Sequence, residues 1–455
     1  MYFSFINLWC SKNLVDTQYL LWRILERYWS DFYYDNDPFS EEVDLVFLNT
    51  CWFISSGREE MFENIFELLN AWKKVCLLWC AVQYFEKLVK EEELSDEEIK
   101  KREILKQNKN LYFLSWDEVA HFSPDMISKK IPHIMTDFVR SDNARAYTNL
   151  DLWYEYLKIA EGCNNHCAFC IIPKIRGKQV SLPIKQVIEN AKNLIKQGAK
   201  ELILIAQDST RYWIDLYWKS QLFELLEEID HLEWDFHYRV LYLYPDLLTK
   251  QHLQKLTQLK KFIPYFDIPF QHSSEKLLKS MWRFYDYKQA LEFLKYIKEH
   301  FKESFIRTNF IIWFPWETEE DFQHLLSFIS EDYFDNIALF EYHDEPLAPS
   351  YKFKNKVDDE TIRERFERAN TLVNELLWKR EEKLKNKEQE WRVMDIEEDE
   401  NWEIWYTVLP FLHCPEVDES YIVSWWAISQ ATHKSWKKVK NDNIQIGDSV
   451  TFTLL

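Results

Sequence analysis

A repeated order of strand then helix is the feature of this chain that most restricts its fold. Between about residue 151 and residue 355 the order occurs six times. Repeats of this kind form a parallel sheet covered by helices, and six of them predict a partial (βα)6 barrel with functional residues at the carboxyl ends of its strands. The expected strands are 155–160, 201–206, 239–244, 265–270, 305–312 and 336–342.

The first 117 residues show the same alternation on a smaller scale. Strands are expected at 3–8, 44–49 and 75–79, with amphipathic helices between them. Such a segment predicts an α/β domain of three layers, and the polar stretch after it is expected to be a linker.

The chain changes character after the barrel. Residues 357–390 form one charged helical stretch, which is expected to be a solvated connector. Short strands follow and predict a small all-β module. The domains are therefore expected at 1–117, 149–383 (the barrel with its connector helix) and 384–455.

Three cysteines stand together directly after the first barrel strand. The segment EGCNNHCAFC places Cys163, Cys167 and Cys170 in a Cys–x3–Cys–x2–Cys pattern. Thiolates hold [4Fe–4S] clusters, and three ligands leave one iron open to chelate a small molecule. The alternative is a zinc site with His166 or a distant residue as fourth ligand. The position at a strand end and the lack of a second CxxC favour the cluster.

A second set of cysteines follows the three strands of the first domain. Cys10, Cys51 and Cys80 each come just after a strand, so they could meet at one sheet edge and hold a second cluster. Each could instead be a small buried hydrophobe, and the spacing leaves both interpretations open. Cys76 and Cys414 are expected to be structural.

The cysteine usage also indicates the cell compartment. Eight cysteines scattered through 455 residues favour reduced thiols and the cytosol over a disulfide framework. No stretch approaches the roughly 18 apolar residues of a membrane span. We therefore expect a cytoplasmic protein without a membrane partner.

Several segments, in order along essentially the whole chain, resemble the radical-SAM methylthiotransferases. They are LWCSKNLVD, LNTCWF, LWCAVQ, KIAEGCNNHCAFCIIPKIRGK, LIAQDSTRY, DIPFQH and RTNFIIWFPWETEEDF. The resemblance implies an N-terminal domain with an auxiliary [4Fe–4S] cluster on Cys10, Cys51 and Cys80. It also implies a radical-SAM barrel whose [4Fe–4S] cluster, on the other three cysteines, binds S-adenosylmethionine. The terminal module would be a TRAM domain.

Within that family, the segments IIPKIRGK, LYLYPD and CPEVDESYIV resemble one branch. Its members methylthiolate the β-carbon of an aspartate in the twelfth protein of the small ribosomal subunit. The charge of the chain agrees with this branch. The formal net charge is −20, and residues 391–455 contain eleven acidic and five basic residues. An acidic module suits a basic ribosomal protein better than a nucleic acid.

The resemblance implies a reaction and its partners. A 5′-deoxyadenosyl radical would remove a hydrogen from the aspartate, and a sulfur donor and a reductant would be required. Two alternatives remain: a transfer-RNA methylthiotransferase acting on an isopentenyl-adenosine, and a non-catalytic module that binds an iron–sulfur cluster or zinc.

Further candidates for cofactor binding lie on the barrel strands. Two pairs of polar residues end the second and fourth strands, and one pair lies within the fifth. They are Gln207, Asp208, Gln271, His272, Arg307 and Thr308. His272 is more often a structural hydrogen-bonding residue, whereas Arg307 could pair with a carboxylate.

The glycine content is abnormal. The chain has 5 glycines and 21 tryptophans, whereas average usage would give about 7% glycine. Seven tryptophans stand where the resembled family carries glycine, namely Trp9, Trp52, Trp79, Trp213, Trp218, Trp313 and Trp316. Glycine supplies positive φ, which tryptophan resists. Our hypothesis is that UGA codons, read here as tryptophan, encode glycine.

Overall fold

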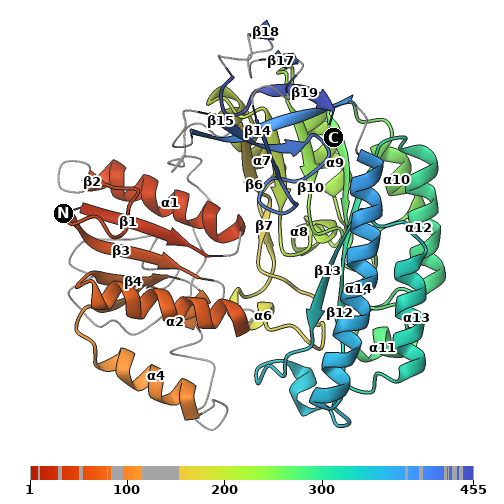
Figure 1. Ribbon diagram of the computed structural model, residues 1–455, viewed down its shortest axis with the longest axis horizontal. Coiled ribbons are helices and arrows are strands. Elements are labelled where there is room, and N and C mark those ends of the chain that lie inside the picture. The colour runs from red at the N-terminus through yellow and green to blue at the C-terminus, as the bar shows by residue number, and fades with distance from the viewer. Residues whose placement is uncertain are drawn as a thin grey trace. The chain divides into compact units, whose positions relative to one another are not determined.

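The described residues of a computed structural model form two large parallel sheets, one large antiparallel sheet and a small two-stranded sheet (Figure 1). The structure describes residues 2–8, 11–28, 33–50, 55–78, 80–83, 96–114, 153–384, 388–398, 403–424, 428, 430–432, 438–439 and 444–453. Contacts divide the chain into two compact units. One contains residues 1–148, 161–182 and 343–352, and the other contains 149–160, 183–342 and 353–455. The three domains expected from the sequence, at 1–117, 149–383 and 384–455, stay a prediction.

The sheet of the first unit is parallel and has helices on both faces. Its strands, in spatial order, are β2 (Tyr33–Tyr34), β1 (Tyr2–Asn7), β3 (Val43–Asn49), β4 (Lys74–Leu78) and β5 (Leu111–Leu114). Its helices are α1 (Ser11–Tyr28), α2 (Ser55–Asn70), α3 (Cys80–Gln83) and α4 (Asp96–Gln107). Short strands β2 and β5 are additions to the three that the sequence predicts.

Side chains of β3 alternate between two cores, as a strand buried on both faces requires. Val46 and Leu48 pack in the cluster that contains the inner face of α2. Leu45 and Phe47 pack in the cluster that contains the inner face of α1. The three-layer α/β fold expected for this segment is therefore confirmed.

The second unit contains six parallel strands in an open sheet, so the expected partial barrel is confirmed. In spatial order they are β13 (Asn336–Glu341), β12 (Phe305–Ile312), β11 (Phe262–Asp267), β10 (His237–Val240), β9 (Glu201–Ile205) and β6 (Tyr154–Lys158). The helices of this part are α7 (Ile184–Lys196), α8 (Ile214–Tyr217), α9 (Leu222–Asp230), α10 (Lys250–Leu256), α11 (Glu275–Ser280), α12 (Tyr287–His300) and α13 (Glu319–Ser330).

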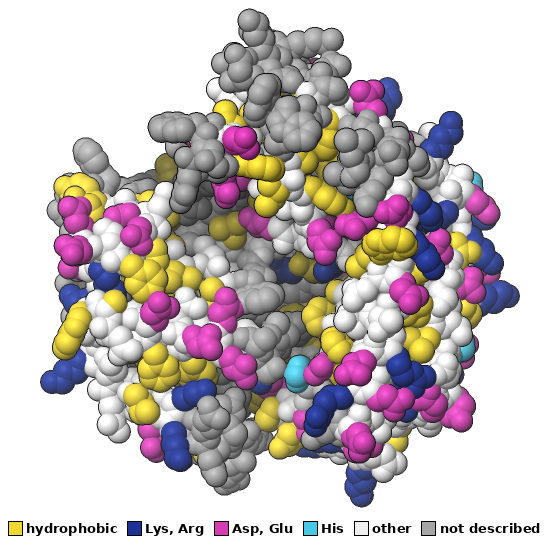
Figure 2. Space-filling model, viewed as in Figure 1, with side chains coloured by type: hydrophobic (Ala, Val, Ile, Leu, Met, Phe, Trp, Pro, Cys, Tyr) yellow, Lys and Arg dark blue, Asp and Glu magenta, His cyan; other side chains and the backbone are white. Residues whose placement is uncertain are grey.

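The long helix α14 (Asp359–Leu384) is more than a solvated connector. Arg365, Ala369, Val373 and Leu376 recur at helical spacing and are buried, which makes one face of α14 part of the core of this unit. Acidic and basic side chains are interspersed over the face of α13 and α14 drawn in Figure 2. The expectation of a solvated helix therefore holds for the outer face alone.

The terminal module is an antiparallel sheet, as expected. Its strands are β16 (Tyr421–Ser424), β15 (Ile404–Pro410), β14 (Glu388–Glu398), β19 (Ser449–Thr453), β17 (Gln430–Thr432) and β18 (Lys438–Val439), in spatial order. Its core includes Trp391, whose ring stacks on Phe452 with centroids 4.7 Å apart.

The loop after β15 attaches this module to the amino ends of the barrel strands. Arg239 donates to the carbonyl oxygen of Leu412 over 2.9 Å, and Tyr154 donates to Glu416 over 2.8 Å. Asn336 donates to Asp418 over 2.7 Å. The amino ends of barrel strands contribute stability, whereas functional residues gather at the opposite ends.

Cys414 lies in this attachment. It is fully buried, and burial raises the pKa of its thiol well above its usual range. A neutral buried thiol behaves as a small hydrophobe. The structural role expected for Cys414 agrees with this position.

Across the described residues, no helix has both the length and the apolar character that a membrane crossing requires.

Candidate functional site

The cysteine loop follows β6 and the short strand β7 (Ala160–Glu161), and it is folded against residues 177–179. Gly162 has φ +74, and a Cβ there would clash with the backbone carbonyl of Lys178, so the position requires glycine. The backbone N–H of Cys163 donates to the carbonyl oxygen of Gly177 over 3.1 Å. Asn164 accepts a 3.0 Å hydrogen bond from the backbone of Gln179. These contacts hold the loop in one conformation.

Within the loop, backbone groups surround the thiols. The N–H of Asn165 points at the sulfur of Cys163 over 3.4 Å, and the N–H of Cys170 donates to the carbonyl of Cys167 over 3.1 Å. Cys163 and Cys167 are buried, whereas Cys170 is half-buried. The backbone N–H of Asn165 thus provides one donor to the sulfur of Cys163.

An arginine in the same loop region connects it to helix α1. Arg176, which follows α6 (Ile172–Ile175), lies 3.3 Å from Asp16 and 3.0 Å from Glu161, and it also hydrogen-bonds Asn13. Asp16 and Arg176 have buried side chains, so this is an ion pair largely removed from water. Arg176 therefore connects the cysteine loop to the first turns of α1.

Only one cysteine of the second set lies in the described part of the chain. Cys10 and Cys51 lie outside the described residues. Cys80 begins α3 directly after β4 and is buried, and it packs in the same hydrophobic cluster as Ile171 and Ile175. Ile171 is the residue after Cys170. The assignment of the three cysteines to a second cluster stays a prediction.

The donor set of the loop fits an iron–sulfur cluster. It places three thiols within eight residues, which matches the cysteine ligation of such clusters. No three His, Cys, Asp or Glu side chains of the described residues are grouped closely enough to hold one metal ion. In a cubane cluster each thiolate binds a different iron, so its ligands need not converge on a single point.

The predicted polar residues after β9 lie where barrel sites form. Gln207 and Asp208 are both buried at the carboxyl end of that strand. Asp208 accepts a 3.0 Å hydrogen bond from the backbone of Thr210 and lies 3.2 Å from Arg211. It therefore caps the 3-10 turn η4 (Ser209–Arg211), and its part in cofactor binding stays a prediction.

The predicted residues on β12 are bonded to the neighbouring strand β11. Arg307 lies 3.1 Å from Asp267, so the carboxylate that it pairs with here belongs to the chain itself. Thr308 donates to the carbonyl of Ile268 over 2.8 Å. Both residues lie in the first half of the strand, away from its carboxyl end.

Gln271 and His272 follow β11 and adjoin the loop after β12. Gln271 has φ 67 and bridges to β12 through its backbone. His272 is fully buried, and its Nδ1 accepts a 2.9 Å hydrogen bond from the backbone of Ser274. Its Nε2 lies 3.6 Å from a carboxylate oxygen of Glu317.

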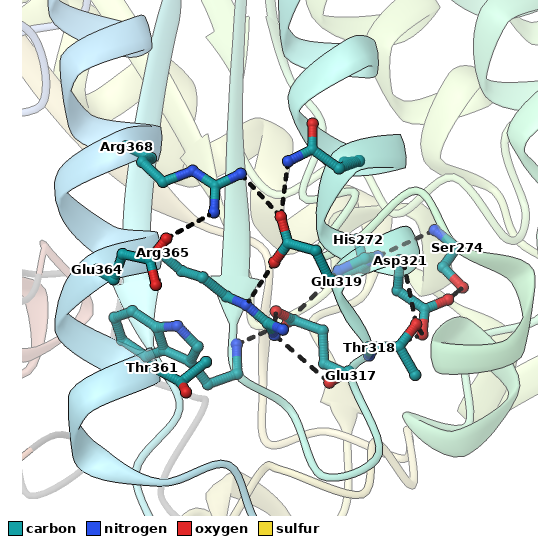
Figure 3. A network of polar contacts seen from close by, with 12 residues as sticks. His272, Ser274, Glu317, Thr318, Glu319, Asp321, Thr361, Glu364, Arg365 and Arg368 are labelled. Atoms are coloured by element: carbon teal, nitrogen blue, oxygen red, sulfur yellow. Dashed lines mark hydrogen bonds and ion pairs between the residues drawn. The ribbon is translucent and has the colours of Figure 1, made fainter.

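Glu317 is the centre of a buried network at this edge (Figure 3). One of its oxygens accepts from the backbone N–H of Trp313 over 2.7 Å. The other accepts from Arg365 of α14, also over 2.7 Å. The pair fixes the loop 313–317 at the carboxyl end of β12, next to His272. Neither Glu317 nor Arg365 was a predicted site residue; the buried periodicity of α14 was the available signal for Arg365.

Asp321 organises the next turn. It forms a capping box with Thr318 at the start of α13 and accepts a 2.6 Å hydrogen bond from Ser274. Burial alone would raise the pKa of Asp321, but hydrogen bonds from Lys276, Ser274 and Thr318 outweigh it and hold that pKa well below its usual range. The carboxylate therefore stays charged and joins the segment after His272 to α13.

Breaking the buried pair should be costly. We expect Arg365→Met to lower the free energy of unfolding by about 3–5 kcal/mol, because Glu317 would remain buried without its cation. Arg368→Met is the matched control on the same helix. Its partner Glu319 is 49% exposed, so the loss should be about 1 kcal/mol or less. Equal losses for the two variants in urea unfolding would contradict this account of the network.

Two protein-family models match this chain, one over the N-terminal α/β segment and one over most of the barrel. The radical SAM superfamily matches residues 157–329, which include the cysteine loop and most of the parallel sheet of the second unit. The uncharacterised protein family UPF0004 matches residues 3–99, which include the three predicted auxiliary cysteines.

Individual relatives match nearly the whole chain. The ribosomal protein uS12 methylthiotransferase RimO of Pseudothermotoga lettingae is 34% identical over 416 residues, which cover 90% of this chain and 90% of that protein. The RimO protein of Aquifex aeolicus is 33% identical and covers 91% of this chain and 88% of its own length. That of Dictyoglomus thermophilum is 35% identical, with 84% and 85% covered.

Proposed function

The chain belongs to the family of ribosomal protein uS12 methylthiotransferases, and we propose that it adds a methylthio group to the β-carbon of an aspartate of that ribosomal protein. It is a radical S-adenosylmethionine enzyme, which requires a [4Fe–4S] cluster and S-adenosylmethionine. The observation that carries the proposal is the cysteine loop, folded by Gly162 and attached by Arg176, in a chain related to these enzymes along nearly its whole length.

The cysteine loop holds the first cluster in this proposal. Cys163, Cys167 and Cys170 would each bind one iron, and the backbone N–H of Asn165 points at the sulfur of Cys163. When bound, the cluster and S-adenosylmethionine supply a carbon radical able to remove hydrogen from an unactivated carbon.

Other residues fix loops at the carboxyl ends of the barrel strands. Glu317 and Arg365 fix the backbone of the loop after β12, and His272 fixes the loop after β11 through Ser274. These are positioning roles, because each of these side chains forms its hydrogen bonds with other residues of the protein. Arg307, bonded to Asp267, takes a similar role.

The auxiliary cluster is the second part of the proposal. Cys10, Cys51 and Cys80 would hold it and present the sulfur that is transferred. Cys80 supports this placement, since it lies at the end of β4 and shares a hydrophobic cluster with Ile171 beside the cysteine loop. A reductant and a sulfur donor would be required in addition.

Two purified substrates test the substrate class. The enzyme, reconstituted anaerobically with iron and sulfide, is incubated with S-adenosylmethionine labelled in its methyl group. Label should enter the ribosomal protein and not transfer RNA that carries isopentenyl-adenosine. Label in the RNA alone would replace the proposed substrate, and absence of S-adenosylmethionine cleavage would contradict the proposed chemistry.

The acidic β-module is proposed to dock the basic substrate protein. Glu397 and Glu398 are exposed at the end of β14, whereas the adjacent Asp399 and Glu400 lie outside the described residues. Deleting the module is an unsuitable test, because Arg239 and Tyr154 depend on its loop for hydrogen bonds. Charge reversal is the better choice.

We expect the double variant Glu397→Lys, Glu398→Lys to raise the Kd for the ribosomal protein about 3- to 10-fold at low salt, as two exposed ion pairs allow. Higher salt should reduce the difference. The matched control reverses Glu360 and Glu367, which are exposed on α14, and produces the same change in net charge. An equal weakening by both pairs would show that net charge matters and the location does not.

A further inference from the structure

Six tryptophans have backbone conformations that suit glycine. Among the described residues, 11 that are not glycine have positive φ, and six of these are tryptophan. They are Trp72, Trp213, Trp218, Trp282, Trp313 and Trp316, with φ between 59 and 76. A bulky side chain in this region is a genuine outlier, because its Cβ is forced against the backbone. The tryptophans Trp153 and Trp391, both with buried rings, are not among them.

Two of the six occupy the position that a glycine takes elsewhere in the chain. Helix α7 ends at Lys196, and just after it the N–H of Gly198 donates to the carbonyl of Ile195 and the N–H of Ala199 donates to that of Leu194. This hydrogen-bond pair is the Schellman motif, which requires positive φ and favours glycine. Four of the five glycines of the chain have positive φ.

The ends of α2 and α11 repeat that pair of bonds around a tryptophan. After α2, Trp72 donates to Leu69 over 3.1 Å and Lys73 donates to Leu68 over 3.0 Å. After α11, Trp282 donates to Lys279 over 3.1 Å and Arg283 donates to Leu278 over 2.8 Å. The backbone of each stretch is that of a glycine-terminated helix.

The indole rings at two of these positions contribute little to packing. Trp72 is 88% exposed and Trp218 is 93% exposed. Burial of an aromatic ring is what would offset a strained backbone, and these rings remain in water. The side chain therefore gives no reason for tryptophan at either position.

In the loop after β12, the chain uses the backbone of the two tryptophans. The N–H of Trp313 donates to Glu317 over 2.7 Å, and that of Trp316 donates to the carbonyl of Asn355 over 3.1 Å. Both residues have positive φ, so glycine would make the same two hydrogen bonds without strain.

We propose that the native protein carries glycine at these six positions, because the cells that encode it read the codon UGA as glycine. UGA differs by one base from the glycine codon GGA and by one base from the tryptophan codon UGG. A table that reads UGA as tryptophan would produce the observed excess of 21 tryptophans over 5 glycines. Tryptophans encoded by UGG stay tryptophan. This proposal is independent of the proposed substrate.

Peptide mass spectrometry of the protein isolated from the cells that encode it tests the proposal directly. Peptides that contain positions 72, 213, 218, 282, 313 and 316 should carry glycine. Peptides with positions 153 and 391 should carry tryptophan, because these residues have ordinary φ and their rings are packed in cores. Tryptophan at position 313 or 316 in the native protein would overturn the proposal.

Single substitutions in the recombinant chain give a second test that does not need the native source. Trp72→Gly and Trp218→Gly should each raise the midpoint of thermal unfolding by about 2–4 °C, since glycine relieves the strain. Trp378→Gly is the matched control, because Trp378 is also exposed but lies inside helix α14, where glycine costs helix stability. It should lower the midpoint. A lower midpoint in all three variants would overturn the proposal.

Discussion

Replacement of Cys163 by alanine is expected to abolish the reductive cleavage of S-adenosylmethionine. The loop would keep two thiols, Cys167 and Cys170, and two thiolates cannot hold a cluster that leaves just one iron open. The loss should exceed about 100-fold, because formation of the carbon radical depends on that cluster. Formation of 5′-deoxyadenosine after anaerobic reconstitution and reduction measures it.

Cys414→Ala is the control for this result. It also removes one buried thiol, but from the attachment of the terminal module at the amino ends of the barrel strands. Cleavage should therefore persist in that variant. Full cleavage activity in Cys163→Ala would show that the loop does not hold the cluster.

The triple variant Cys10→Ala, Cys51→Ala, Cys80→Ala is expected to separate the two halves of the reaction. Cleavage of S-adenosylmethionine should persist, whereas formation of the methylthio product should fall below detection. Iron content should fall from about eight to about four atoms per chain, since each cubane cluster contains four. Iron analysis and product analysis on the same sample measure both.

The single variant Cys76→Ala is the control for the triple variant. Cys76 lies inside β4 and packs in the core against α1, so its loss should leave both clusters in place. Product formed at normal yield by the triple variant would show that no auxiliary cluster takes part.

Strong periodicity made most of the fold predictable. All six barrel strands were predicted close to their observed positions, because buried parallel strands are continuous apolar runs with helices between them. The strand expected at 239–244 is shorter, since Tyr242 has φ 62 and its N–H donates to Asp267 beyond the end of β10. Strands β2 and β5 have two and four residues, which is too short for a periodic signal.

The charged helix shows why a composition argument was incomplete. Most residues of α14 are polar, which suggested a fully solvated helix. However, one narrow stripe of α14, which includes Ala369 and Val373, is buried against neighbouring elements. Arg365 lies in the same stripe. A charged residue on a buried stripe indicates an ion-pair partner, but a sequence alone does not show that the partner is Glu317.

The cysteine loop could be found from spacing because cluster ligation restricts residue type and order. The six other candidate residues were placed at the right sheet, yet Asp208, His272 and Arg307 are bonded to the chain itself. Asp208 and His272 accept hydrogen bonds from backbone groups two residues further along, whereas the partner of Arg307 is Asp267, which is distant in the sequence and which a linear pattern does not reveal. Glu317 was missed because its charged partner, Arg365, is likewise distant in the sequence.

The most direct test of the central claim is mass spectrometry of ribosomal protein uS12 after incubation with the reduced, reconstituted enzyme and S-adenosylmethionine. The account predicts one aspartate whose mass has increased by a methylthio group in place of one hydrogen, and no such product with the Cys163→Ala variant. An unmodified ribosomal protein, in a reaction where S-adenosylmethionine is cleaved and transfer RNA gains the methylthio group, would contradict it.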